Sequence, residues 1–456
     1  MRDVEPGPDG ELAAFLADHP DTRHLDICLV DLCGNAVGKR LPRGHFESFW
    51  RGGTPICAAM QLVDVNGNTA DPMGHGFSDG DPDAIAVPVP GTLVPVPWAP
   101  EPRAQCLVEL RRAGDGEPFW YQPRQILKSV AARFAELDLT PVAAVELEFY
   151  LIDRERDADG RPQPPLSPRT GARTSAGKVL SLAMLDEFGP VLSAIEHAAR
   201  AQRLPVSTMI SEYGAGQFEV NLEHRADPLE AADHGALLRR LVQEVARAKG
   251  MDATFLSKPY ADQSGSGLHI HLSLMDRDGN NVFDPAVAGA EQRLAHAVGG
   301  LKATMAEAMA IFAPNINAFR RFAADQFVPV TSDWGDNNRS VAFRVPASPG
   351  KARRIEHRTA GAEANPYLVM ATVLAGVHVG LTHHLDPGAR HTGNAGSAMD
   401  DALPFTMWDA LARLEAAEIL PGYLGADYPK VYATVKRAEF EAFMGEAFAR
   451  EFEWYL

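Results

Sequence analysis

Polar side chains recur with a period of two in four short, otherwise apolar segments of the sequence. In the segment VAAVELEFYL, Glu146 and Glu148 fall on one face of a strand, whereas Val145, Leu147 and Phe149 fall on the other. The same alternation groups Gln217, Glu219 and Asn221; His269, His271 and Ser273; and Arg354, Glu356 and Arg358. One such segment is typical of a strand with a solvated face, but four segments carrying acids, histidines and arginines predict a shared polar cavity.

These residue types favour a cavity that holds divalent metal ions. Neighbouring carboxylates repel one another unless a cation neutralises them, and Mg²⁺ or Mn²⁺ prefers oxygen ligands. The candidate ligands are Glu146, Glu148, Glu212, Glu219, His269 and Glu356, which suffice for two adjacent ions. A zinc site is not expected, because no cysteine accompanies these residues and the HExxH motif is absent.

Arginines accompany the acids in the same segments. Arg339 and Arg344 in NRSVAFRVP, with Arg354 and Arg358 in RRIEHR, can grip phosphate or carboxylate groups at two points. Metal ions, arginines and carboxylates together suit phosphoryl transfer. The run GNAVGKR has the wrong spacing for a Walker A motif and lacks Ser or Thr after Lys39, so a nucleotide would have to bind without a P-loop.

Two kinds of segment must position these residues. Between residues 24 and 111, short apolar runs broken by Gly, Pro, Asn and Asp predict short strands and turns rather than helices. After a turn-rich junction, helical spacing appears at 124–137, 228–249 and 291–312, among the strands that carry the acids. Residues 153–178 and 388–401 are predicted to be exposed loops. A chain of 456 residues organised in this way predicts two domains, the second of them α/β.

The composition is typical of a soluble globular protein, with 46% hydrophobic and 23% charged residues. A formal net charge of −17 argues against nucleic acid as a partner and would favour the approach of cationic small molecules. The apolar stretch 367–381 is shorter than the ~20 residues of a membrane span, so we expect a buried helix and no membrane association. The sequence starts with no secretory leader pattern, and its four cysteines are too scattered for a disulfide framework, which together predict a cytoplasmic protein.

Several ordered motifs resemble those of the glutamine synthetase superfamily: EYGAGQFEVN, KPYADQSGSGLHIHLSL, NNRSVAFRVP and KARRIEHRTAGAEANPYL. The resemblance extends from DLCGNAVGKR to the C-terminal EFEWYL. It implies an α+β protein with an N-terminal β-grasp domain at residues 20–113 and a glutamine-synthetase-type catalytic domain at 120–456. It also implies a dodecamer of two stacked hexameric rings, whose active sites are completed by an acidic loop of the neighbouring N-terminal domain.

The resemblance assigns roles residue by residue. Glu148, Glu212 and Glu219 resemble the ligands of a first metal, and Glu146, His269 and Glu356 those of a second, in a site with two or three Mg²⁺ or Mn²⁺ ions. His271, Ser273, Arg344 and Arg354 resemble the ATP-binding set, to which Arg339 adds a phosphate contact. Ser264, Gly265, Arg321 and Arg358 resemble the glutamate-binding set. The implied reaction is attack of the glutamate side-chain carboxylate on ATP, followed by displacement of phosphate from the acyl phosphate by a nitrogen nucleophile. Arg339, Arg321, Asp64 and Asp83 are the implied catalytic residues.

The sequence departs from ammonium-using members of this superfamily at the site of the nucleophile. In RFAADQFVPV, Phe327 occupies the place of an acid that lies over ammonium, and an apolar ring cannot attract or deprotonate that ion. Asp64 and Asp83 best match the other acids of that site and with Phe327 form the expected amine pocket. Ser264 stands where Asn is usual. These departures resemble the γ-glutamylpolyamine synthetase branch, of the γ-glutamylputrescine kind.

Three alternatives stay open at this point. Asp325, two residues before Phe327, could replace the missing charge in an ammonium-using glutamine synthetase. Ethanolamine, short alkylamines or aromatic amines could take the place of a polyamine as the substrate. A non-catalytic, ring-forming sensor would be expected to have lost metal ligands, yet all six matching positions are retained.

Overall fold

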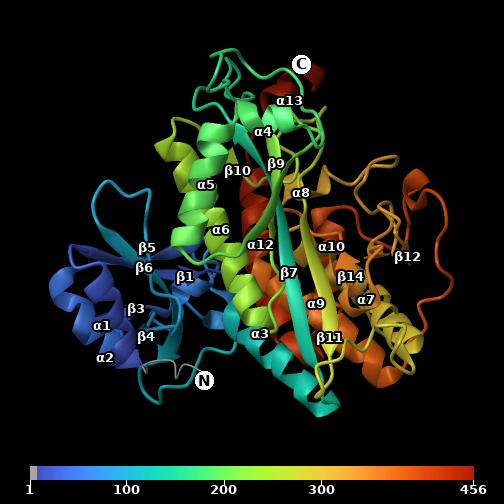
Figure 1. Cartoon of the computed structure of the whole chain (residues 1–456), viewed down its shortest axis with the longest axis horizontal. Helices are drawn as coiled ribbons and strands as arrows, with labels where there is room; N and C mark the ends of the chain where they lie inside the picture. Colours follow the sequence, from blue (N-terminus) through green and yellow to red (C-terminus); the bar gives the residue numbers. More distant parts are fainter. Residues whose placement is uncertain (1–7, 456) are drawn as a thin grey trace.

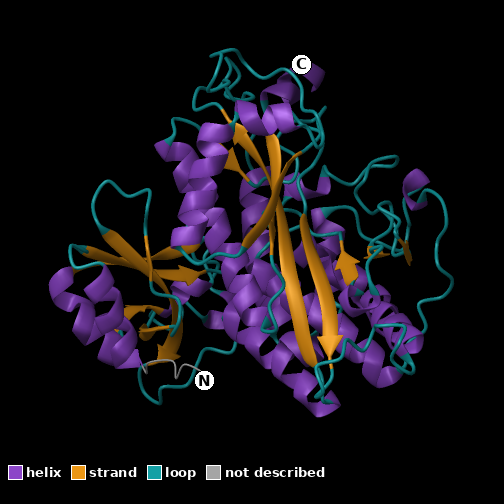
Figure 2. Cartoon of the chain, in the orientation of Figure 1, coloured by secondary structure: helices purple, strands orange, loops and turns teal. Residues whose placement is uncertain are grey.

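The computed structural model describes residues 8–455 and contains two β-sheets that lie side by side (Figure 1). Strands between residues 24 and 112 form the smaller sheet, and strands between 140 and 357 form the larger. Helices cover the outer side of the smaller sheet and pack behind the larger one (Figure 2). The predicted α+β architecture is confirmed, and the domain limits 20–113 and 120–456 stay a prediction that agrees with this division.

The smaller sheet has the strand order β2-β1-β6-β4-β3, with β5 paired to β6. Its strands are β1 (His24–Val30), β2 (Ala36–Pro42), β3 (Thr54–Cys57), β4 (Asp83–Pro88), β5 (Val94–Pro95) and β6 (Arg103–Arg112). β1 and β6 are parallel, and the other strand pairs of this sheet are antiparallel. A parallel central pair with antiparallel neighbours agrees with the expected β-grasp arrangement.

Helices α1 (Pro8–Asp18) and α2 (Phe46–Gly52) lie against this sheet (Figure 1). The prediction of strands and turns alone for residues 24–111 was wrong for α2. Phe46, Phe49 and Trp50 are buried at spacings that bring them onto one face of a helix, and this face joins the apolar core around Ile27. The same part of the chain also contains three 3₁₀ turns: η1 (Arg43–His45), η2 (Ala58–Gln61) and η3 (Pro72–Gly74).

The larger sheet has the strand order β12-β13-β14-β11-β7-β9-β8, with β10 paired to β7. Its strands are β7 (Thr140–Ile152), β8 (Val206–Ser211), β9 (Gln217–Leu222), β10 (Asp252–Thr254), β11 (Leu268–Met275), β12 (Trp334–Asp336), β13 (Phe343–Val345) and β14 (Ile355–His357). Three cross-strand pairs carry the predicted chemistry: His269 with Glu146, Glu219 with Glu148, and His271 with Glu356. Directly opposite residues of antiparallel strands share a face, so this register alone gathers the acids and histidines.

The helices that follow the smaller sheet are α3 (Pro123–Ala132), η4 (Arg133–Leu137), α4 (Leu182–Glu187), α5 (Gly189–Ala201), α6 (Pro228–Ala248), α7 (Ala290–Phe312), α8 (Ile316–Phe319), η5 (Gly350–Ala352), α9 (Pro366–His383), η6 (Ala395–Ser397), α10 (Met407–Glu415), α11 (Pro421–Leu424), α12 (Tyr428–Met444) and α13 (Ala449–Tyr455). The three predicted helices correspond to α3 with η4, α6 and α7. Val145, Leu147 and Phe149 point from β7 into the apolar core that these helices form, so the opposite face of the sheet is left for the acids.

Helix α9 lies at the centre of this core. It is long and apolar enough to cross a membrane, but 83% of its apolar window is buried inside the protein, as expected of a core helix. It crosses α7 closely, because a Cβ on Gly300 would lie 1.9 Å from the carbonyl oxygen of Gly376. The predicted buried helix at 367–381 is therefore confirmed.

Candidate active site

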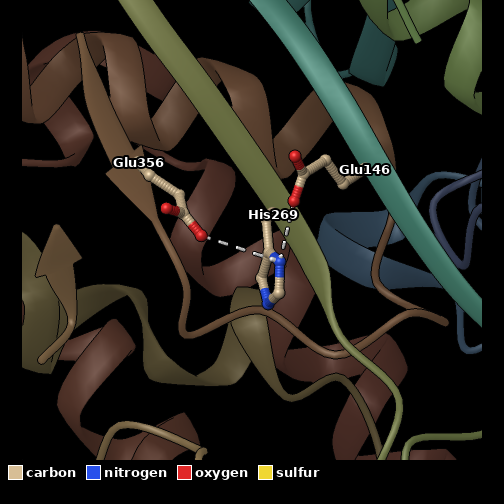
Figure 3. A group of neighbouring side chains, drawn as sticks. All are labelled: Glu146, His269 and Glu356. Atoms are coloured by element: carbon tan, nitrogen blue, oxygen red, sulfur yellow. Dashed lines mark hydrogen bonds and ion pairs between the residues drawn. The ribbon is translucent and has the colours of Figure 1, made fainter. Parts of the chain in front are cut away.

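Three ligand-type side chains meet on the polar face of the larger sheet (Figure 3). Nδ1 of His269, on β11, lies 3.3 Å from Oε2 of Glu146 on β7 and 4.0 Å from Oε1 of Glu356 on β14. The three side chains point toward one another from neighbouring strands (Figure 3). The residues predicted to hold one metal ion are thus brought together by the structure.

A second group shares the same imidazole. Nε2 of His269 lies 3.9 Å from Oε1 of Glu148, and donor atoms of Glu148, Glu219 and His269 all lie within 4.8 Å of one another. Glu212, predicted as a ligand with Glu148 and Glu219, is not a member of this compact group among the described residues. It follows the end of β8, where its backbone N–H donates to the carbonyl oxygen of Gln217 at 2.9 Å.

Hydrogen bonds from neighbouring strands and turns orient the carboxylates. Oε1 of Glu146 accepts from Nδ2 of Asn221 at 2.9 Å and lies 2.8 Å from Nε2 of His271. Nδ1 of His271 accepts from Nε of Arg354 at 3.0 Å, which places the imidazole proton on Nε2, facing Glu146. The backbone N–H of Gly267 donates to Oε2 of Glu148 at 2.9 Å.

The acids on the Glu148 side hold protons more strongly than ordinary glutamates. Burial raises the pKa of Glu148, although the charge of Arg321 opposes the shift. Burial, with repulsion from Glu146 and Glu148, raises the pKa of Glu219 well above its usual range. Burial and the charge of Glu148 raise the pKa of Glu212 to about 7. The arginines near these carboxylates therefore do not outweigh their burial and mutual repulsion.

The acids on the other side have cationic or hydrogen-bonding neighbours that outweigh burial. Burial opposes ionisation of Glu146, but the adjacent imidazole of His271 and the hydrogen bond from His269 lower its pKa below the usual range. Burial also opposes ionisation of Glu356, but Arg358 and the two histidines lower its pKa to about 2. Burial, assisted by Arg358, lowers the pKa of His269, so its imidazole is neutral near pH 7 and retains a lone pair for a metal ion.

The donor set fits divalent cations. Glu148, Glu212 and Glu219 supply oxygen ligands whose ionised forms the nearby arginines only partly stabilise, and the neutral His269 supplies a nitrogen ligand. Glu146 and Glu356 complete the group on the other side of the imidazole. Bound divalent ions would neutralise this cluster and polarise phosphate oxygens placed beside it.

Two arginines enclose Glu356. Nη1 of Arg344 lies 2.6 Å from Oε2 of Glu356, and Nη1 of Arg358 donates to Oε1. The Nε atoms of both arginines are buried and have no hydrogen-bond partner. Buried N–H groups without a partner are costly, so these two donors suit an anionic ligand. The contacts of Arg344 with nucleotide and of Arg358 with glutamate stay predictions, which these two donors support.

The other predicted arginines are held differently. Arg321 is buried, and its Nη1 donates to the carbonyl oxygens of Thr359 and Ala360 at 2.8 and 3.1 Å. Arg339 is exposed in the turn between β12 and β13, and its charge acts on the carboxylate of Glu212. An exposed guanidinium on a turn is free to move toward a substrate phosphate.

A cavity of about 430 Å³ opens next to Glu146. Its lining consists of Ala144, Glu146, Ser207, Asn221, Leu222, Glu223, His224, His271 and Arg354. Two of the predicted ATP-binding residues, His271 and Arg354, are therefore in its wall. Ser273 lies two residues after His271 on β11 and is also buried. It does not line this cavity. His224, whose ring contacts that of His271 with 6.0 Å between centroids, was not predicted, although it directly follows the β9 segment.

A glycine-containing turn covers the Glu148 side of the cluster. A Cβ on Gly265 would lie 2.7 Å from Cγ of Arg321, and a Cβ on Gly267 would lie 2.8 Å from Nη2 of the same residue. Only glycine therefore permits Arg321 to lie this close to the turn. Ser264 contributes its carbonyl oxygen, which accepts a hydrogen bond from the Tyr150 hydroxyl at 2.7 Å.

The position of the missing acid is exposed and aromatic. The Phe327 side chain is 61% exposed, and its ring stacks on Tyr213 with 6.0 Å between centroids. Tyr213 was not predicted, although its position directly after Glu212 in the sequence could have indicated it. Asp325 has a left-handed backbone (φ 57°), and its carboxylate accepts a hydrogen bond from Asn394 Nδ2 at 3.2 Å.

The two predicted acids of the N-terminal region lie on the smaller sheet and its loops, and among the described residues no hydrogen bond or ion pair joins them to the carboxylate cluster. Asp64 is buried, and its Oδ1 accepts hydrogen bonds from the backbone N–H groups of Asn66 and Asn68, both at 2.8 Å. Asp83 begins β4 and is exposed. Asp64 therefore stabilises a turn of its own chain, whereas Asp83 presents its carboxylate to solvent.

Comparison with known proteins agrees with this geometry. Residues 121–455 match the family described as "Glutamine synthetase, catalytic domain". Gamma-glutamylputrescine synthetase PuuA of Escherichia coli (strain K12) is 38% identical over 98% of this chain and 94% of its own length. Glutamate–isopropylamine ligase of a Pseudomonas species is 32% identical over 80% of this chain and 79% of its own. Gamma-glutamylethanolamide synthetase GlnA4 of Streptomyces coelicolor is 30% identical over 95% of this chain and 92% of its own.

A solved structure of GmaS in complex with ADP has the same fold. It superposes with a TM-score of 0.82 at 28% sequence identity, over 97% of this chain and 99% of that one. The matched family uses ATP and divalent metal ions, for which the cluster around His269 has the appropriate donors. With a family match over residues 121–455 and a relative that is 38% identical over 98% of the sequence, the chain belongs to the glutamine synthetase family.

Proposed function

We propose that this protein is an ATP-dependent ligase that joins the γ-carboxylate of L-glutamate to a primary amine through γ-glutamyl phosphate. The observation that carries the proposal is the pair of carboxylate groups around His269, with arginines on either side of Glu356. Carboxylate is a poor electrophile, so it must be activated by phosphate before a nitrogen can replace an oxygen. A site with acids for metal ions and arginines for anions serves that activation.

The residues take distinct parts in this proposal. One metal ion would be held by Glu146, His269 and Glu356, and a second by Glu148, Glu212 and Glu219. The proposed site takes two or three ions in all. Arg344 and Arg354 bind ATP beside His271, and Arg339 moves from its exposed turn onto the transferred phosphate. Arg358 and Arg321 hold glutamate, and Arg321 is kept in place by the backbone carbonyls of Thr359 and Ala360.

The proposed amine is a polyamine or another small organic amine rather than ammonium. Support comes from Phe327, whose exposed apolar ring can neither attract nor deprotonate ammonium. Asp325, two residues before Phe327, accepts a hydrogen bond from Asn394. In this proposal it does not replace the acid that is missing at Phe327. Relatives named for putrescine, isopropylamine and ethanolamine agree with an organic amine.

The test is an amine panel. Enzyme, ATP, Mg²⁺ and glutamate are incubated with ammonium, putrescine, spermidine, ethanolamine, isopropylamine or benzylamine, and phosphate release is measured. We expect turnover with at least one organic amine to exceed turnover with ammonium. Equal or faster turnover with ammonium would contradict the amine proposal, and no glutamate-dependent turnover with any nucleophile would contradict the ligase. The variant Glu212→Ala should lose the glutamate-dependent turnover and serves as the background control.

We also propose that the protein forms a dodecamer of two hexameric rings in the cytoplasm. Asp83 supports shared active sites, because it begins β4 in the smaller sheet and presents an exposed carboxylate, whereas the carboxylate cluster of its own chain lies on the larger sheet. All four cysteines are free thiols, which agrees with a reducing compartment. Light scattering coupled to gel filtration measures the assembly. A catalytically active monomer would contradict shared sites.

A further inference from the structure

Two aromatic rings stack on the surface beside the metal-ligand candidates. The rings of Tyr213 and Phe327 lie 6.0 Å apart between centroids at an interplanar angle of 26°, and the side chains are 53% and 61% exposed. Large aromatic side chains are usually covered in folded proteins, since each has 150–250 Å² to bury. A stacked pair that is left half exposed therefore offers a flat apolar surface to a ligand.

The backbone places Tyr213 next to the reaction centre. Tyr213 directly follows Glu212 in the sequence, so its side chain begins one residue from a predicted metal ligand. The N–H of Gly214 then donates to Oε1 of Gln217 at 2.9 Å, and Nε2 of Gln217 donates to the carbonyl oxygen of Gly265 at 3.0 Å. The backbone that carries Tyr213 is thus tied through Gln217 to the glycine-containing turn beside Arg321.

A second segment packs against the base of the aromatic pair. The N–H of Leu180 donates to the carbonyl oxygen of Ser211 at 2.8 Å, and a Cβ on Gly177 would lie 2.3 Å from the carbonyl oxygen of Tyr213. Leu180 holds a left-handed backbone (φ 56°) that is unfavourable for a leucine, and its side chain is 68% exposed. Another apolar residue is thereby presented next to β8, the strand that ends just before Glu212.

We infer that the Tyr213–Phe327 pair binds the methylene chain of the amine substrate and makes the enzyme selective for alkylamines by chain length. This inference rests on the proposed ligase function. Methylene groups lose contact with water when they lie on the rings, and a second ammonium group at the far end would be attracted by the ring faces. Tyr213 is then a specificity-determining residue, distinct from the ligands that run the phosphoryl transfer.

The experiment measures kcat/KM for unbranched amines from ethylamine to hexylamine, each relative to hydroxylamine, which attacks the same acyl phosphate and has no carbon chain. We expect kcat/KM to rise about two- to fourfold for each added methylene in the unaltered enzyme. Tyr213→Ala and Phe327→Ala should each flatten this series, whereas Tyr213→Phe should keep its slope. Trp408→Ala, which removes an exposed ring that contacts Phe440, is the matched control and should also keep the slope.

Butylamine and putrescine differ only in the distal ammonium group, so their ratio separates chain packing from attraction of a second charge. A series that is flat in the unaltered enzyme, or unchanged in Tyr213→Ala, would overturn the inference while leaving the ligase intact. Dissociation of the assembly in Tyr213→Ala would also overturn it, because the rings would then form an interface between copies. Absence of product even with hydroxylamine would refute the proposed function itself.

Discussion

The carboxylate cluster and the aromatic pair lie close together but are built in opposite ways. Around His269, the side chains are buried or half-buried, their hydrogen bonds come from neighbouring strands and a turn, and their pKa values are displaced in both directions. The rings of Tyr213 and Phe327 are more than half exposed and stack on each other. The cluster is therefore organised before any ligand binds, whereas the rings of the aromatic pair become covered only when a ligand packs against them.

This difference assigns the reaction to the carboxylate cluster and the choice of nucleophile to the aromatic pair. The cluster requires several strands in one register, so single changes there should remove activity altogether. The aromatic pair depends on two side chains, so changes there should exchange one nucleophile for another. The following tests are arranged from the largest expected effect to the smallest.

Replacing His269 by alanine should damage the cluster most. Both carboxylate groups share this imidazole, so both would lose a donor, and glutamate-dependent phosphate release should fall at least about 100-fold. Binding of Mn²⁺, measured by calorimetry, should weaken in the same variant. His296→Ala is the control, since His296 lies on α7 and contacts the carbonyl oxygen of Leu385. Retention of full activity in His269→Ala would show that the cluster is not the reaction centre.

The metal-free protein should lose stability as the pH rises, and metal ions should restore it. The pKa of Glu212 is raised from an ordinary value of 4.5 to about 7, so its contribution is fully present below pH 4.5 and is lost as the pH passes 7. After allowance for solvent screening, we expect a loss on the order of 2 kcal/mol. The increase in Tm on adding Mn²⁺ should thus be larger at pH 8 than at pH 5.5, and Glu212→Gln should reduce the difference. An equal increase at both pH values would contradict the uncompensated charge.

Phe327→Glu should shift the preference of the enzyme from alkylamines toward ammonium. A carboxylate at this position would attract NH₄⁺ and interrupt the apolar surface, so the ratio of ammonium to alkylamine turnover should rise about tenfold. Phe327→Gln is the matched control, because it has the size of the glutamate without its charge. A rise of the same size in both variants would attribute the effect to lost packing.

The two N-terminal aspartates should respond differently. Asp64→Ala removes the acceptor of two backbone hydrogen bonds and should lower stability by about 1 kcal/mol, measured by urea unfolding. Asp83→Ala removes an exposed carboxylate and should leave the unfolding midpoint unchanged while raising KM for a diamine. A lower midpoint in Asp83→Ala would show that this residue stabilises its own chain.

Much of the cluster could be predicted because strand alternation is local. The period of two in VELEF, HIHLS and RRIEH assigns each side chain to a face before any pairing is known. Which carboxylates meet which imidazole nitrogen is a matter of register between strands more than 100 residues apart, such as β7 and β11. The association of His269 with Glu148 and Glu219 therefore emerged only from the structure.

The aromatic pair and α2 were harder to predict for related reasons. Tyr213 and Phe327 are more than 100 residues apart, and neither belongs to a regular element whose periodicity could indicate a contact. Helix α2 has only seven residues, too few for its apolar spacing to be distinguished from that of a short strand. For Asp64, the motif suggested substrate contact, whereas Asn66 and Asn68 supply local hydrogen-bond donors that occupy its carboxylate.

The single imidazole between two acid groups makes the groups interdependent. A neutral imidazole has one lone pair and one N–H, so His269 can coordinate an ion through only one nitrogen while the other donates a hydrogen bond. If Nδ1 faces the ion beside Glu146 and Glu356, the proton on Nε2 points to Glu148, 3.9 Å away. A cation that draws Glu148 toward itself then changes the electrostatic environment of Nε2 and alters the basicity of Nδ1. Binding of an ion in one group should thus change the affinity of the other group for its ion, because both depend on which nitrogen of His269 carries the proton.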